Sequence, residues 1–342
     1  MKAIQPIALN ATMDIVAFLY PTDIQWNREY YKCGDFSIQI PVNQYSNDMT
    51  FIYTKDRPEI GRITQINYKQ DESGYQYVQL SGYFLENDLN DAVLYPAYWG
   101  HGDHVDDVIK SMVSQHYSGV NVAANRGAGT ATNFNAELGA ALGEQAYDIL
   151  RLHEMSCKVT YDFDNAVKVF DTWQGADHTQ GTASPIIFST AFGNLKNPDI
   201  VTTETSNKNY IIVAGKADQQ DIYETVDLSD GAPLKKIFVS ATGVNYDANT
   251  MTLAQYKQNL RDFGRQELLN NHSTKTNVAF DVLANSYEYL TDFNLGDKCT
   301  VVIPEVGTEL STRIISVHEV GAQGEYKISL EFGDDIVIST GA

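Results

Sequence analysis

The chain has 342 residues, which is more than one ordinary small domain and predicts two to four structural units. Its formal net charge of −20 argues against binding of duplex DNA by a basic face, and leaves two interpretations of the acidity: solubility by self-repulsion, or an acidic inner wall past which a polyanion slides. No apolar run approaches the ~20 residues that cross a bilayer, and Met1–Ile4 has no features of a secretory signal, so we expect no membrane anchor.

The first 95 residues have the pattern of a small antiparallel β-unit. After a turn at Gly34-Asp35, the apolar residues Phe36, Ile38 and Ile40 alternate with polar ones, as in a strand with one buried face. Residues 71–74 have the composition of a hairpin turn. The expected strands are 13–20, 36–40, 60–68 and 75–80.

The middle of the chain has a different character. Apolar residues at helical spacing predict helices over 105–117 and about 136–153, with Asp103 capping the first. The polar segment 120–133 between them is expected to be a loop. Residues 157–161 and 167–173 follow as a hairpin about Asp164-Asn165, so this part is α+β.

From about Pro185 the β-character returns. Strands are expected at 185–190, 209–215 and 278–282, while the charged segment 218–249 contains a turn at Asp230-Gly231. Thr252 and Gln255 match a capping box that opens a helix over Leu253–Asn270. We expect this helix to lie in an insertion, with one face inward, formed by Leu253, Tyr256, Leu260 and Phe263.

A pattern of one turn and three strands occurs near both ends of the chain. The first copy starts at Gly34-Asp35 and ends at Gly82, and the second starts at Gly296-Asp297 and ends at Gly333. Two similar β-units in one chain would let a trimer present six. Two unrelated β-meanders that share common turn residues explain the pattern equally well.

Local motifs for chemistry are weak. The segment 101–104 contains two His and one Asp, but a rigid metal site needs three or four ligands, and Asp103 is better explained as a helix cap. The glycines of 127–130 are followed by no Lys, and Asp162 and Asp164 are more typical of a hairpin turn than of a catalytic pair. We therefore assign no catalytic, cofactor-binding or metal-binding residue and no cofactor.

Two further sets of residues bear on partners and compartment. Cys33, Cys157 and Cys299 are far apart, which predicts reduced thiols and folding in a cytosol rather than a disulfide framework. The second set is an aromatic cluster beside charged residues, and it is either an interface anchor or packing against the neighbouring strand. Its members, the candidate interface residues, are Trp26, Arg28, Tyr30 and Tyr31.

Several segments, in their order along the chain, resemble a family of tail-tip hub proteins of long-tailed bacteriophages, which also form the N-terminal module of tail-associated lysins. The opening signature is Trp26–Pro41. The other similar segments are Ser81–Leu85, Phe188–Leu195, Asn209–Gly215, Leu295–Asp297 and Arg313–Glu319.

The resemblance implies a structural virion protein rather than an enzyme. It would be a homotrimer at the distal end of a phage or prophage tail, made in the cytoplasm of the bacterial host. The expected partners are the distal tail protein, the tail tube, the tape measure protein and downstream tip or receptor-binding proteins. DNA would pass through its acidic channel without specific binding.

The resemblance also implies two tube-like antiparallel β-barrels in a β-rich α+β chain. The expected domains are the first barrel (1–95), an α+β domain (96–182), the second barrel (183–225 with 274–342) and an inserted helical segment (226–273). Many relatives continue into a hydrolase or a receptor-binding extension, whereas this chain stops at Ala342, so we expect other proteins to supply those activities.

Two alternatives come from other classes of protein. One is a hydrolase that acts on cell-wall glycans or peptides. The other is a carbohydrate-binding adhesin, which would use the tryptophans Trp26, Trp99 and Trp173.

Overall fold

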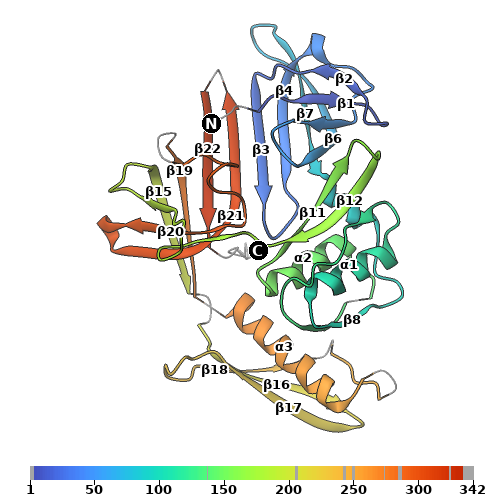
Figure 1. Ribbon diagram of the computed structural model, residues 1–342, viewed down its shortest axis with the longest axis vertical. Helices are drawn as coiled ribbons and strands as arrows, with labels where there is room; N and C mark the ends of the chain where they lie inside the picture. The colour runs from blue at the N-terminus through green and yellow to red at the C-terminus, as the bar shows by residue number, and fades with distance from the viewer. Residues whose placement is uncertain are drawn as a thin grey trace.

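The computed structural model describes residues 4–136, 138–204, 207–241, 244–248, 251–272, 274–283, 287–322 and 325–333. Most of the segment Met1–Ile4 and the last nine residues of the expected second barrel therefore lie outside the described residues. Figure 1 shows a large sheet, helices α1 and α2 beside its N-terminal part, and a smaller unit with α3 set apart from it.

The strands of the large sheet come from both ends of the chain. They are β1 (Ile7–Leu9), β2 (Ile15–Phe18), β3 (Asp23–Glu29), β4 (Asp35–Pro41), β5 (Phe51–Tyr53), β6 (Ile60–Gln70), β7 (Gln76–Phe84), β13 (Asp177–His178), β14 (Ile187–Ser189), β15 (Leu195–Glu204), β19 (Thr274–Val282), β20 (Lys298–Ile303), β21 (Thr308–Ala322) and β22 (Glu325–Phe332).

The remaining elements form smaller units. Three small sheets pair β8 (Trp99–Gly102) with β10 (Thr132–Asn135), β12 (Val167–Trp173) with β9 (Asn121–Val122) and β11 (Ser156–Asp162), and β16 (Tyr210–Ala217) with β17 (Gln220–Asp227) and β18 (Lys236–Ser240). The α-helices are α1 (Val105–His116), α2 (Leu142–Leu152) and α3 (Leu253–Asn271), and the 3-10 helices are η1 (Val42–Gln44), η2 (Leu85–Asp91) and η3 (Pro304–Val306).

The strand pairing of the described residues does not form the two closed barrels that the resemblance predicts. Among the described residues the main path is open, in the order β15-β19-β22-β21-β3-β4-β7-β6-β5-β1-β2. The two expected barrels share one sheet because β21 pairs with β3, from Ser316 opposite Glu29 to Ala322 opposite Asp23. The fold is a β-rich α+β fold with a large antiparallel sheet.

Within this sheet the same five-stranded unit occurs twice. The first module has the strand order β3-β4-β7-β6-β5, and the second has the order β15-β19-β22-β21-β20. Every neighbouring pair in both modules is antiparallel. If the five strands of each module are numbered by their order in the chain, their order across the sheet is 1-2-5-4-3 in both modules. The two modules therefore have the same topology.

A β-bulge at the same place supports this equivalence. The register of β6 against β7 shifts between Ile63 and Gln65, and that of β21 against β22 shifts between Ile314 and Ser316. Each shift leaves one extra residue on the fourth strand of its module. The shared order and bulge favour a repeated unit over two unrelated meanders.

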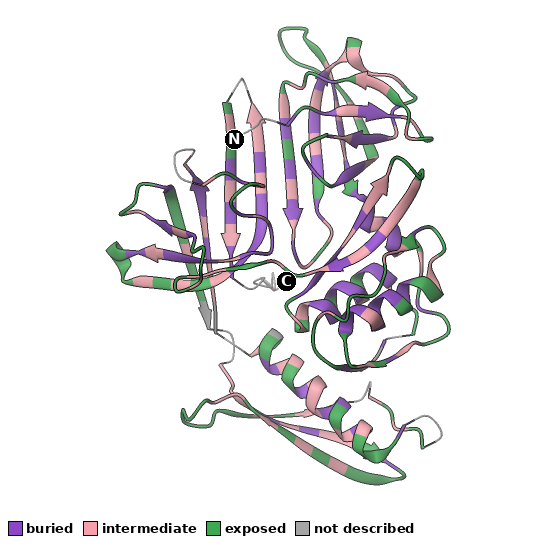
Figure 2. Cartoon of the chain, in the orientation of Figure 1, coloured by how far each residue is buried: buried purple, intermediate pink, exposed green. Residues whose placement is uncertain are grey.

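Alternation of apolar and polar residues determines which face of each strand is covered. In β4 the residues Phe36, Ile38 and Ile40 are buried, as the sequence predicts, and Trp26 packs beside them in the core of the first module. Phe280, Val317 and Leu330 are in the core of the second module. Figure 2 shows the resulting stripes of buried and exposed residues along the strands.

The first two helices differ from prediction at their N-termini. The N-cap of α1 is His104 rather than Asp103, and no side chain caps the helix. The second helix starts at Leu142 instead of about Ala136, because the backbone N–H groups of Ala136, Gly139 and Leu142 donate to carbonyls of residues 92–98, next to the pairing of β10 with β8. Helical spacing alone could not reveal that pairing.

The third helix has the predicted bounds and the predicted capping box between Thr252 and Gln255. Tyr256 and Leu260 are fully buried, but Leu253 is exposed. The helix packs on β16 and β17, outside the large sheet, as expected for an insertion. Strands β17 and β18 lie in the charged segment 218–249, in which only a turn was predicted. They pair with β16, although the predicted limits assign β16 to the second barrel.

Candidate assembly site

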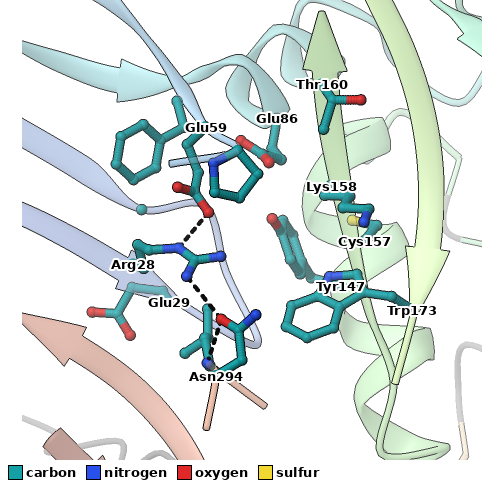
Figure 3. A pocket seen from close by; sticks show the side chains of 14 residues that line it. Arg28, Glu29, Glu59, Glu86, Tyr147, Cys157, Lys158, Thr160, Trp173 and Asn294 are labelled. Atoms are coloured by element: carbon teal, nitrogen blue, oxygen red, sulfur yellow. Dashed lines mark hydrogen bonds and ion pairs between the residues drawn. The ribbon is translucent and has the colours of Figure 1, made fainter. Parts of the chain in front are cut away.

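Buried charges join the two modules to each other and to the α+β part of the chain. The guanidinium of Arg28 on β3 pairs with the Glu59 carboxylate, and donates to the Tyr289 hydroxyl and, over 3.1 Å, to Asn294 Oδ1. Figure 3 shows Arg28 between Glu59 and Asn294, at a cavity of about 100 Å³. Burial opposes the charge of Arg28, but Glu59 and Tyr289 hold its pKa above the ordinary value.

A second buried pair crosses the same boundary. Arg57, in the loop before β6, donates from Nε to Glu319 Oε1 on β21 over 2.9 Å, and from Nη2 to Oε2 over 2.5 Å. The Tyr326 hydroxyl also donates to Glu319, whose side chain has no exposed surface. Such a fork-to-carboxylate pair fixes the relative position of the modules as well as their distance.

Burial favours the neutral form of the Glu86 carboxyl group more strongly than that of the other acids in this region. It lies in η2, is buried, and accepts a hydrogen bond of 3.0 Å from the Val159 backbone N–H. Burial raises its pKa from 4.5 to about 7. Burial likewise raises the pKa of the nearby thiols of Cys33 and Cys157, and all three cysteines are free, in agreement with prediction.

The raised pKa of Glu86 predicts a pH dependence of stability. The folded chain binds the proton more tightly than the unfolded chain, so the stabilisation is present below pH 4.5 and is lost as the pH rises to about 7. Glu86→Gln should remove about 2–3 kcal/mol of that decline, measured by urea unfolding between pH 4.5 and 8. The exposed Glu72→Gln should keep the wild-type slope, and an equal slope in Glu86→Gln would contradict the prediction.

The structure places the predicted interface residues mainly inside the chain. Trp26 and Tyr30 have no exposed surface, and Arg28 is 5% exposed. Trp26 packs against Phe36 and Phe84, with ring centroids 5.7 and 4.8 Å away. Trp26 therefore packs inside the first module, while Arg28 and Tyr30 join that module to distant parts of the same chain.

Tyr30 and its neighbour hold the α+β part against the sheet. The Tyr30 hydroxyl donates to the Glu154 carbonyl over 3.0 Å, and its ring meets Trp173 edge-on. Half-buried Tyr31 lies under the guanidinium of Arg151. Tyr30 and Tyr31 thus contact residues more than a hundred positions away in the chain. No local sequence pattern predicts such contacts.

The other sequence candidates have structural roles. Asp162 accepts hydrogen bonds from the backbone N–H groups of Asp164 and Asn165, so the acidic pair forms the predicted hairpin turn. No group of three or more His, Cys, Asp or Glu among the described residues is placed to hold a metal. Trp26 is buried and Trp99 and Trp173 are half-buried, so the proposed saccharide-stacking surface is not formed by exposed tryptophans.

The face of the large sheet opposite the cores is polar and continuous across the boundary between modules. Asn27 on β3 donates to Asp35 over 2.7 Å and lies 3.1 Å from His318 on β21. The Glu331 carboxylate beside His318 raises the pKa of that histidine. The acidic residues here include Asp23, Glu29, Asp35, Asp281 and Glu331, and the lysines include Lys69 and Lys327.

Several strand edges of the large sheet have no partner strand among the described residues, including that of β2 at one end of the main path, and two of them are on the strands equivalent to β3 and β21. β15 pairs only with β19, so its other edge is open. The part of β6 after the bulge, from Gln65 to Gln70, pairs only with β7, since β5 covers only Ile60 to Arg62. Open edges of this kind invite pairing with another chain.

This architecture is shared with solved tail proteins. A tail protein from Neisseria meningitidis MC58 has a TM-score of 0.63 at 12% identity, over 98% of this chain and 97% of that chain. The 43 kDa tail protein of prophage MuSo2 from Shewanella oneidensis has a TM-score of 0.60 at 12% identity, over 96% and 98%. Prophage tail protein gp18 from Listeria monocytogenes EGD-e has 0.57 at 14%, over 96% and 94%.

The fold is therefore that of phage and prophage tail proteins. Residues 20–334 match the family described as Siphovirus ReqiPepy6 Gp37-like protein, and the chain belongs to this family. Among curated proteins none matches the chain. None of the helices in the described ranges combines the length and hydrophobicity that a membrane span requires.

Proposed function

We propose that the chain is a structural protein of a long-tailed phage or prophage tail tip, a homotrimeric hub that closes the tail tube. The observation that carries this proposal is the pair of modules with one strand order and one bulge position, joined edge to edge by β3 and β21. Three such chains would present six equivalent modules, and a ring of modules removes the open edges of the sheet.

The two modules correspond, in this proposal, to the tube-like barrels of the hub. The proposed limits are 1–95 for the first module and 96–182 for the α+β domain. For the second module they are 183–204 with 274–342 rather than the expected 183–225 with 274–342, because β16 and β17 form a separate sheet with β18. The insertion therefore starts before the expected 226–273. Ring closure by neighbouring chains would supply the barrel wall that a single chain leaves open.

The polar face of the sheet would line the channel. It carries more acidic than basic residues and is opposite the apolar cores. Like charges repel, so such a wall would let DNA pass without retaining it. The proposed position is the distal end of the tail, after synthesis in the host cytoplasm.

Its partners would be the tail tube, the distal tail protein and the tape measure protein on one side, and tip or receptor-binding proteins on the other. The test is mass photometry of the chain mixed with the distal tail protein of the same phage. We expect a complex that contains three copies of the chain. A chain that remains monomeric in this mixture and is absent from purified tails would overturn the proposal, and turbidity loss of purified cell walls would support the hydrolase alternative.

A further inference from the structure

The contact between modules inside the chain predicts the contact between chains. The strand β3 is the first of its module and pairs with β21, the fourth of the other module. The equivalent first strand β15 and fourth strand β6 have open edges. We propose that β15 of one copy pairs antiparallel with β6 of the next copy. This contact rests on the proposed ring of three chains.

The equivalence of the modules determines the register of this contact. Trp26 lies opposite Phe36 in the first module, and Ile200 lies opposite Val278 in the second, where both facing residues are buried on the second strand. The position of Ile200 on β15 is therefore that of Trp26 on β3. The bulge in the same way makes Gln65 on β6 equivalent to Ser316 on β21.

Transferring the internal pairing gives specific neighbours across the contact. Inside the chain, Asn27 is opposite His318 and Gln25 is opposite Val320. The same register between copies places Val201 opposite Asn67 and Asp199 opposite Lys69. Asp199 and Lys69 are both exposed in the single chain and would face each other with opposite charges.

Exposed apolar side chains on β6 also indicate that a second copy of this chain pairs there. Ile66 and Tyr68 lie on the core face, opposite buried Leu80 and Val78, yet they are 47% and 58% exposed. Their equivalents on β21 have no exposed surface: Val317 lies in the core of the second module, and Glu319 is buried against Arg57 of the first module. A second copy of this chain carries, at β15, the strand equivalent to β3, which lies beside Val317 and Glu319.

A disulfide across the contact tests the register. The Tyr30 N–H donates to the Ile315 carbonyl over 2.9 Å, so Asn27 and His318, three places along, are a non-hydrogen-bonded pair. Val201 and Asn67 correspond to that pair, whose Cα atoms are roughly 4.5 Å apart, within the range of a disulfide. Both side chains point away from the cores, so Val201→Cys with Asn67→Cys should preserve the fold.

Tails that contain the double variant should, after mild oxidation, give covalent dimers and trimers on a denaturing gel, and no larger species. Reduction should return them to monomers. The matched control is Val201→Cys with Tyr68→Cys, whose side chains lie on opposite faces and should not cross-link. Each single variant measures the background from half-buried Cys33.

The outcomes separate this inference from the proposed function. A trimer in the particle that does not cross-link, or that cross-links equally in the control, would overturn the contact and leave the hub standing. Cross-linked species that extend beyond three copies would support the contact and overturn the closed trimer. Tails without the chain, for wild type as well as variant, would overturn both.

Discussion

Glu319→Ala is expected to destabilise the folded chain by about 3–5 kcal/mol, because it leaves the buried guanidinium of Arg57 without its carboxylate. The carboxylate is fully buried and accepts from both Arg57 and Tyr326. Removing it also weakens the contact between β3 and β21, on which the arrangement of the two modules depends. Urea unfolding at neutral pH measures the loss.

The control separates the unpaired charge from lost packing. Arg57→Met with Glu319→Leu removes both charges and keeps apolar volume, so this double variant should recover most of the stability. Glu325→Ala, on an exposed side chain of the neighbouring strand β22, should cost less than about 0.5 kcal/mol. A cost for Glu319→Ala as small as that of Glu325→Ala would contradict the prediction.

Thr202→Pro is expected to abolish assembly while leaving the chain folded. Thr202 on β15 occupies the position of Arg28 on β3, which pairs with Val317, so its N–H points to the open edge. Proline removes that donor and cannot join a strand ladder there. Three contacts per ring would be lost together, and incorporation into tails should fall at least roughly tenfold.

Thr202→Val is the matched control, since it keeps the N–H and the β-branched shape. It should assemble like the wild type. Equal thermal unfolding of both variants would show that proline acts on the edge and not on the fold. Normal incorporation of Thr202→Pro would contradict the assignment of β15 to the contact between chains.

Local signals predicted local structure well. The alternation at Phe36–Ile40 and the capping box at Thr252 depend on near neighbours, and both are present as expected. The predicted repeat is only partly confirmed, since β6 and β7 are equivalent to β21 and β22 as expected. The Gly-Asp turns at Gly34 and Gly296 are not equivalent, because β4 is the second strand of its module and β20 is the third.

The structural features that the sequence did not predict depend on contacts between residues far apart in the chain. For Trp26, Arg28 and Tyr30 the sequence left two alternatives, an interface anchor or packing against the neighbouring strand. Trp26 packs against Phe36 of that strand, whereas Tyr30 and Arg28 contact Glu154 and Tyr289, which lie more than a hundred residues away. The buried charge of Glu319 has no local mark, since its partner Arg57 is 262 positions distant. Strands β17 and β18 are rich in polar residues, and their few apolar side chains pack against a core to which the distant helix α3 contributes Tyr256 and Leu260.

The smaller unit that carries α3 leaves the large sheet and returns to it at one place. Glu204, where β15 ends, lies opposite Thr274, where β19 begins, and the two strands pair along their length. Chain segments whose ends are adjacent tolerate exchange of what lies between them. This hairpin is therefore a graft point at which the whole inserted unit can be exchanged, provided that the replacement also covers β10, which α3 contacts.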